Sequence, residues 1–189
     1  VVFSNKYFTA NKTKSPQWLL TSFTQTISLI KKEKMLQPGT PAPDFSLFDS
    51  GKNKVSLSSF QGKNVLLLFF PQAFTSTCTR ELCAVRDDIG RYSNATAQVL
   101  GISVDSVFTL ARYKEDQQYN FPLLSDFNKE VSALYGSLYE NWILDMKGVS
   151  KRSAFLIDKK GIIRYAEVLE NAGEVPDFNA INELLAGLN

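Results

Sequence analysis

Hydrophobic residues in this chain fall into short unbroken blocks, separated by segments in which apolar positions recur every three or four residues. The blocks at 64–70 and 98–104 are almost wholly apolar, a pattern typical of strands that are buried on both faces of a sheet. Further strands are predicted where shorter runs alternate or are rich in β-branched and aromatic residues: 44–48, 54–57, 121–126, 152–158 and 161–168, the last two as a hairpin.

Helical patterns lie between these strands. Their predicted ranges are 76–92, 106–119 (with Ser106 as N-cap), 128–135 and 177–188. Strands that alternate with helices, together with one hairpin, indicate an α/β protein with a central mixed β-sheet flanked by helices. No apolar run approaches the roughly 18 residues that a membrane-spanning helix needs, so we expect no membrane role.

Residues 1–34 differ from the rest of the 189-residue chain in charge and composition. They hold six lysines and one acid, whereas the remainder carries a mild negative charge, and the whole chain has a net charge of +2. We interpret them as an N-terminal extension, a disordered tail or a segment upstream of a natural start at Met35, in preference to a targeting peptide. Residues 35–189 are expected to form one enzymatic domain. Their acidic balance does not favour a nucleic-acid partner.

The chain has no histidine and only two cysteines, which excludes several kinds of active site. Neither a Ser-His-Asp triad nor a Cys-His pair can be built. Common zinc sites need about four Cys or His ligands, so we expect no metal, and nothing indicates an organic cofactor. Two cysteines are also too few for a disulfide scaffold. Any disulfide between them should therefore take part in a reaction rather than stabilise the fold.

Both cysteines lie in one stretch, FFPQAFTSTCTRELC, which spans residues 69–83. Cys78 falls in the first turn of a predicted helix, where unpaired backbone N–H groups and the helix dipole stabilise a thiolate without any histidine. Thr75 lies three residues earlier, close enough for its hydroxyl to bond the thiolate or a bound oxygen. The stretch therefore predicts a reactive thiol.

The two sulfurs are expected on different sides of this helix. Four positions with 3-4-3 spacing define a buried stripe: Leu82, Val85, Ile89 and Tyr92. Cys78 is in line with this stripe, and Cys83 lies about 140° from it, so Cys83 should not be a core residue unless a second helix face is covered. Their Cα atoms would be about 8–9 Å apart, whereas a disulfide needs less than about 7 Å. A bond between them therefore requires the first turns of the helix to unwind.

The pattern Pro71-x-x-x-Thr75-x-x-Cys78 resembles the active-site signature of the peroxiredoxins, and the likeness covers about Leu36 to Leu188. The segments FFPQAFT, FPLLSD and GIIRYA resemble the AhpE-type branch. A cysteine five residues after Cys78, followed by Arg86-Asp87, resembles the bacterioferritin-comigratory or Q-type branch. The resemblance implies a thioredoxin-like fold and a thiol-dependent peroxidase that reduces hydrogen peroxide and alkyl hydroperoxides.

The resemblance also implies roles for five residues. Cys78 would be the peroxidatic cysteine, Thr75 would hydrogen-bond the thiolate and the peroxide, and Pro71 would shield the reacting centre from water. Arg152 would polarise the peroxide and stabilise the thiolate. Cys83 would be the resolving cysteine that condenses with the Cys78 sulfenic acid. The implied partners are the peroxide and thioredoxin or a similar dithiol, and we expect a cytoplasmic monomer or homodimer.

The sequence leaves alternative functions open. Many AhpE-type relatives have no resolving cysteine, so a one-cysteine peroxidase resolved by an external thiol is a second interpretation, and a peroxide-sensing switch protein is a third. A thioredoxin-like oxidoreductase is disfavoured by the missing Cys-x-x-Cys motif. For Glu81 we favour an acid that complements the helix dipole over one that orients Arg152 or Arg86. Tyr139 and Trp142 are candidates for a pocket rim or an interface.

Overall fold

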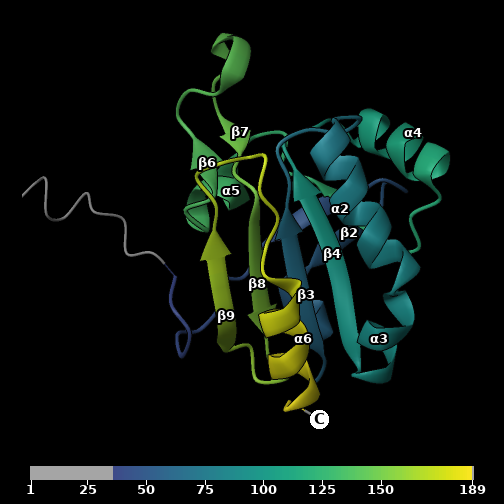
Figure 1. Ribbon diagram of the computed structural model, residues 1–189, viewed down its shortest axis with the longest axis vertical. Helices are drawn as coiled ribbons and strands as arrows, with labels where there is room; N and C mark the ends of the chain where they lie inside the picture. Colours follow the sequence, from purple (N-terminus) through teal and green to yellow (C-terminus); the bar gives the residue numbers. More distant parts are fainter. Residues whose placement is uncertain (1–35, 189) are drawn as a thin grey trace, which may run out of the picture. The chain divides into compact units, whose positions relative to one another are not determined.

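A mixed β-sheet is the centre of the computed structural model, which describes residues 36–188; the predictions for residues 1–34 lie outside this range. Within it, seven strands form one sheet in the order β2-β1-β5-β4-β3-β8-β9 (Figure 1). The strands are β1 (Ser46–Asp49), β2 (Lys54–Ser56), β3 (Asn64–Phe69), β4 (Ala97–Ser103), β5 (Leu123–Ser125), β8 (Ser153–Ile157) and β9 (Ile163–Val168).

Strand β3 lies in the middle of the sheet because its apolar run can be buried on both faces. It pairs in parallel with β4 and antiparallel with β8. Since successive side chains of a strand point to opposite faces, Leu66 and Leu68 join one apolar cluster while Leu67 and Phe69 join the other. All six residues of β3 are buried, as the unbroken hydrophobic block predicts.

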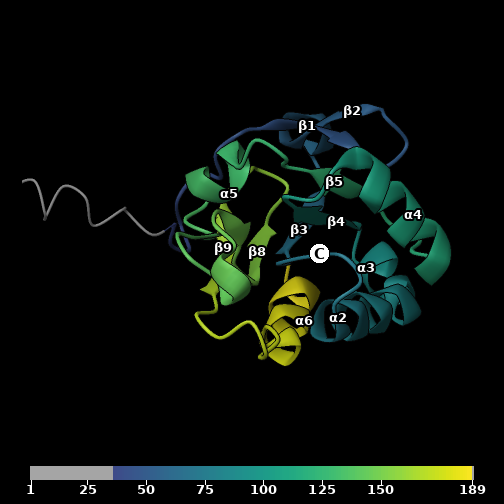
Figure 2. The ribbon, with the colours of Figure 1, turned by 90° about the horizontal axis from the view of Figure 1, so that it is seen from above.

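Helices cover both faces of this sheet (Figure 2). One face carries α2 (Ser76–Asp87), α3 (Ile89–Asn94), α4 (Val107–Gln117) and α6 (Phe178–Ala186); the other carries α5 (Glu130–Leu134) and the short 3₁₀ helix η1 (Leu57–Phe60). Ser106 caps α4 by accepting a hydrogen bond from the backbone N–H of Thr109, as predicted. Among residues 36–188 no helix has both the length and the apolar character that crossing a membrane requires.

The helix predicted over 76–92 is in fact two helices. At Asp88 the backbone leaves helical dihedral angles, with φ −103° and ψ 20°, and α3 starts in a new direction. Asp88 also pairs with Arg91 of α3. Tyr92 is nevertheless buried in the apolar cluster on this face of the sheet, so the predicted apolar stripe is retained although the helix itself is interrupted.

A small hairpin between α5 and β8 is absent from the sequence prediction. Strands β6 (Leu138–Tyr139) and β7 (Val149–Ser150) pair antiparallel, and the 3₁₀ helix η2 (Ile143–Asp145) lies between them. Strands of two residues are too short to show alternation, and Leu144 adopts a positive φ of 56° that no glycine signals. The hairpin projects beyond the end of the sheet (Figure 1) and forms one wall of the site described next.

Candidate active site

The segment between β3 and α2 carries Cys78 to the carboxyl end of the central strand. Pro71 lies two residues after the end of β3 and is buried, and Phe74 turns the chain with a positive φ of 63°. The Asp105 carboxylate accepts a hydrogen bond of 2.9 Å from the backbone N–H of Ala73 and so fixes the loop to the end of β4. Cys78 then lies in the first turn of α2 with its thiol 1% exposed and unpaired.

Arg152 contacts the sulfur of Cys78 although 74 positions separate the two residues. Its Nη2 donates to Sγ over 3.2 Å. The sheet register explains this approach: Ser153 of β8 pairs with Phe69 of β3, so Arg152 lies where β3 ends and the Cys78 loop begins. Two further donations, from Nε at 3.3 Å and from Nη2 at 3.0 Å, reach the carbonyl of Ala172.

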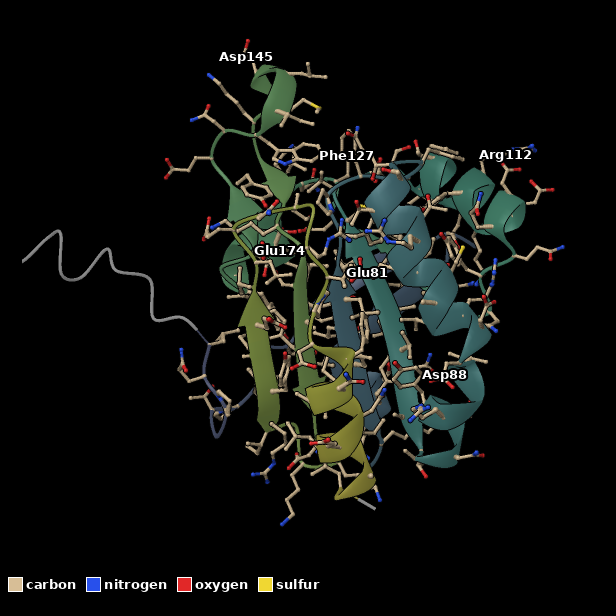
Figure 3. The ribbon with its side chains drawn as sticks, viewed as in Figure 1. Glu81, Asp88, Arg112, Phe127, Asp145 and Glu174 are labelled. Atoms are coloured by element: carbon tan, nitrogen blue, oxygen red, sulfur yellow. The ribbon has the colours of Figure 1, made fainter. Side chains whose placement is uncertain are left out.

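Glu81 forms a buried ion pair with Arg152 through its Oε2 atom. Three residues after Cys78 it lies on the same helix face, so it points into the protein (Figure 3), and it is only 2% exposed. Burial raises the pKa of Glu81 to about 7, against the lowering effect of Arg152. Burial also opposes the charge of Arg152, but Glu81 and Cys78 raise its pKa above the ordinary value.

The favoured interpretation of Glu81 as an acid that merely complements the helix dipole was therefore wrong. A carboxylate in the first turns of a helix usually faces water, and the sequence gives no sign that its partner is a buried arginine 71 positions away. The other interpretation, an acid that orients Arg152, is what the geometry supports. Its Oε1 atom has no hydrogen-bond partner among residues 36–188.

Thr75 and Pro71 both line the cavity in front of Cys78. Thr75 is the N-cap residue of α2, but its hydroxyl does not cap the helix and instead donates to the carbonyl of Gln72 over 2.9 Å. Within the described part of the chain no hydrogen bond joins this hydroxyl to Cys78. Thr75 lines the cavity, and a hydroxyl that donates one hydrogen bond can still accept another from a bound molecule.

The cavity has a volume of about 600 Å³ and brings residues of four separate segments together. Its lining consists of Pro71, Thr75, Ser76, Thr77, Cys78, Tyr139, Asn141, Trp142, Ile143, Arg152, Glu170, Asn171, Ala172 and Gly173. Tyr139 and Trp142 stack with ring centroids 6.2 Å apart, which agrees with the predicted pocket rim. Asp145 marks the outer end of the β6–β7 hairpin in Figure 3. The 170–173 segment was missed because it carries no motif.

Cys83 lies in the second turn of α2, half-buried between that helix and α4. Its Sγ is 3.7 Å from Oε1 of Gln117, and it packs against the apolar cluster that contains Cys78. Cys83 is not among the fully buried core residues, and the exception attached to its prediction applies, because α4 covers the second face of α2 and leaves Cys83 half-buried. Both cysteines are free in this structure, and α2 runs unbroken from Ser76 to Asp87.

A buried thiol at a helix start, held beside a buried arginine and open to a cavity, is the arrangement that thiol-based redox enzymes use. The model of the AhpC/TSA family matches residues 38–166. Alkyl hydroperoxide reductase E of Mycobacterium tuberculosis is 40% identical over 157 residues, which cover 82% of this chain and 99% of that protein. The chain therefore belongs to the AhpC/TSA family.

Two solved structures extend the likeness to three dimensions. Peroxidoxin BcpB of M. tuberculosis superimposes with a TM-score of 0.69 at 29% identity, covering 81% of this chain and 96% of that one. Peroxiredoxin Q of Xanthomonas campestris gives 0.67 at 25% identity, with coverage of 76% and 90%. The predicted thioredoxin-like fold is confirmed, and the protein is a thiol-dependent peroxidase that uses a peroxide and a thiol reductant.

Proposed function

We propose that Cys78 is the peroxidatic cysteine of this peroxidase. Its thiolate attacks one oxygen of the peroxide, so that an S–O bond forms while the O–O bond breaks. The departing oxygen takes a proton and leaves as water or an alcohol, and Cys78 becomes a sulfenic acid. The observation that carries this proposal is the 3.2 Å contact between Arg152 Nη2 and Cys78 Sγ beside an open cavity.

Arg152 has two tasks in this scheme. In the resting enzyme its positive charge and the unpaired N–H groups of the helix start favour the thiolate. During the attack the same donors face the oxygens on which negative charge develops. Glu81 and the Ala172 carbonyl hold the guanidinium in place, so that little reorganisation is needed when the charge moves.

Thr75 and Pro71 complete the proposed site. The Thr75 hydroxyl, which donates to Gln72, offers its lone pairs to the proton of a bound hydroperoxide and thereby orients the O–O bond toward Cys78. Pro71 covers the sulfur with a ring that lacks an N–H, which limits the approach of water. Both proposals are supported by the position of these residues in the cavity wall beside Cys78.

We propose that Cys83 resolves the sulfenic acid. Its thiol condenses with Cys78–SOH, an S–S bond forms, and one water leaves. Because intact α2 holds the two Cα atoms too far apart for a disulfide, its first two turns must unwind first. A dithiol such as thioredoxin then reduces the disulfide by exchange and is itself oxidised. The working domain in this proposal is residues 35–189, which include the whole family match at 38–166.

The half-buried position of Cys83 favours a second candidate, a one-cysteine cycle. If α2 stays closed, α4 keeps Cys83 away from the sulfenic acid, and an external thiol entering the cavity has to resolve Cys78. The chemistry of the first step is the same in both cycles. Only the fate of the sulfenic acid differs, so the two candidates can be separated by the oxidation products of Cys78.

The test is continuous peroxide consumption with thioredoxin, run in parallel on wild type, Cys78→Ser and Cys83→Ser. We expect Cys78→Ser to lose turnover, and Cys83→Ser to be oxidised once at the wild-type rate and then to stop. Mass spectrometry of peroxide-treated protein should find a Cys78–Cys83 disulfide in wild type alone. If wild type also stops at sulfenic acid, the one-cysteine cycle replaces the proposed one; if Cys78→Ser still turns over, the assignment of Cys78 is refuted.

A further inference from the structure

A hydrogen bond from α4 holds the part of α2 that must unwind. Tyr113 of α4 is fully buried, and its hydroxyl is 2.9 Å from the Oγ1 of Thr79. Thr79 follows Cys78 directly and lies between the two cysteines. Within residues 36–188 this is the one side-chain hydrogen bond that joins the segment 76–82 to α4, so it acts at the point where the helix has to open.

Apart from the contact between Cys83 Sγ and Gln117 Oε1 at 3.7 Å, the other polar contacts between α2 and the α4 side lie beyond the unwinding segment. Arg86 donates to the carbonyl of Gln117, and the side chain of Asn120 donates to the carbonyl of Arg86 over 3.1 Å. These bonds fix the second half of α2, which can stay folded while the first half opens. The Thr79–Tyr113 bond is thus made in the closed state and has to break in the open state.

Tyr119 destabilises the closed state of α2, which the Thr79–Tyr113 bond stabilises. Its side chain is buried, 3% exposed, and its hydroxyl has no hydrogen-bond partner among residues 36–188. Its ring meets Tyr113 edge to face at 5.0 Å. Burial, with Tyr113 and Cys83 beside the hydroxyl, raises the pKa of Tyr119. Because Cys83 lies close to this hydroxyl, its departure on opening would let water satisfy a group that the closed state leaves unpaired.

We propose that Tyr113 is a positioning residue that keeps α2 closed and thereby divides the Cys78 sulfenic acid between two fates, an inference that rests on the proposed resolving role of Cys83. In the open state Cys83 condenses with the sulfenic acid and water leaves. In the closed state a second peroxide oxidises the sulfenic acid to sulfinic acid and is reduced to water or an alcohol. Weakening the Thr79–Tyr113 bond favours the first fate, and removing the unpaired Tyr119 hydroxyl favours the second.

The proposal predicts, for three variants, whether disulfide formation becomes faster or slower. Tyr113→Phe removes the bond without removing the ring, and the open fraction and the rate of disulfide formation should rise about fivefold. Thr79→Val breaks the same bond from the other side, so the double variant should be no faster than either single one. Tyr119→Phe should instead slow disulfide formation about threefold, since a buried unpaired hydroxyl is lost from the closed state.

Tyr135→Phe is the matched control. Tyr135 is also buried, and its hydroxyl donates to the carbonyl of Pro43 over 2.6 Å, but it belongs to the apolar cluster on the opposite face of the sheet. Loss of the Tyr135 hydroxyl should lower the free energy of unfolding about as much as Tyr113→Phe does and leave the fate of the sulfenic acid unchanged. Far-UV circular dichroism checks that each variant is folded. If Tyr113→Phe does not fold, Thr79→Val is used to test the proposal.

The experiment mixes each reduced protein with one equivalent of hydrogen peroxide, quenches by alkylation, and measures sulfenic acid and disulfide by mass spectrometry over time. A second series, in turnover with dithiothreitol, finds the peroxide concentration at which half of Cys78 is sulfinic acid. This concentration should rise in Tyr113→Phe and Thr79→Val and fall in Tyr119→Phe, while the first oxidation keeps its rate. Unchanged disulfide rates in both bond-breaking variants, or an equal change in Tyr135→Phe, overturn the role of Tyr113 alone. Absence of any disulfide in wild type overturns the resolving role of Cys83 and this proposal together.

Discussion

Replacing Arg152 by methionine should cost both stability and chemistry, and the two losses can be measured separately. The guanidinium is 1% exposed and makes an ion pair with Glu81, two donations to the Ala172 carbonyl and one to Cys78. Breaking a buried pair by removing one partner costs about 3–5 kcal/mol, because the remaining carboxyl must either keep a buried, unpaired charge or take up a proton. We expect the Arg152→Met variant to unfold at clearly lower urea concentration than wild type.

The chemical loss follows from the single contact with the thiolate. A hydrogen bond to a charged group contributes about 1.5–3 kcal/mol, which corresponds to a roughly 10- to 150-fold lower rate of reaction between Cys78 and peroxide. A second variant separates this effect from instability. In Glu81→Gln/Arg152→Met no charge is left unpaired, so most of the stability should return, whereas the contact with Cys78 is still missing and the rate should stay low.

Urea unfolding gives the stability of the three proteins, and stopped-flow mixing of the reduced proteins with hydrogen peroxide gives the rate of the first oxidation. Glu81→Gln alone is the control, since it retains Arg152 beside the sulfur. A double variant that reacts as fast as wild type would show that Arg152 does not assist the thiolate. A single Arg152→Met variant as stable as wild type would contradict the buried ion pair.

Two further predictions concern the pH dependence of stability and the selection of the peroxide. Because the pKa of Glu81 is about 7 in the folded protein and 4.5 ordinarily, the folded state binds more protons than the unfolded state between these values. The free energy of unfolding should therefore fall by about 3 kcal/mol as pH rises through this window. Urea unfolding at pH 5 and 7.5 should show a smaller fall in Glu81→Gln than in wild type. Equal falls in the two proteins would refute the raised pKa of Glu81. Trp142→Ala removes apolar surface from the cavity wall, which should lower kcat/KM for cumene hydroperoxide about tenfold and leave hydrogen peroxide nearly unaffected. Equal losses for both would exclude Trp142 from substrate selection.

The sheet and the position of Cys78 follow from local features of the sequence. The unbroken apolar block of β3 predicts a central strand, and Pro71 ends it at the place where the loop begins. The phase of the next helix correctly predicts that Cys78 faces inward. These features depend on periodicities of a few residues and on the stereochemistry of proline, so they can be predicted from one amino-acid sequence.

Other parts of the site depend on contacts that no local pattern records. The partnership of Glu81 with Arg152 arises from the pairing of β3 with β8, and the carbonyl of Ala172 belongs to a segment without a sequence signal. The burial of Cys83 depends on how α4 packs over the second face of α2. Helix phase describes one face of one helix, and it cannot say whether a neighbouring helix covers another.

The lack of histidine connects these observations. A thiolate without a histidine needs another positive charge, and an arginine keeps its charge even when it is almost fully buried. A buried guanidinium in turn needs acceptors, which Glu81 and the Ala172 carbonyl supply from α2 and from the loop after β9. Glu81 belongs to the same first turns of α2 that must unwind for Cys83 to reach Cys78. Opening the helix therefore also separates Glu81 and Cys78 from Arg152, so the contacts that prepare the thiolate for peroxide are those that delay the disulfide.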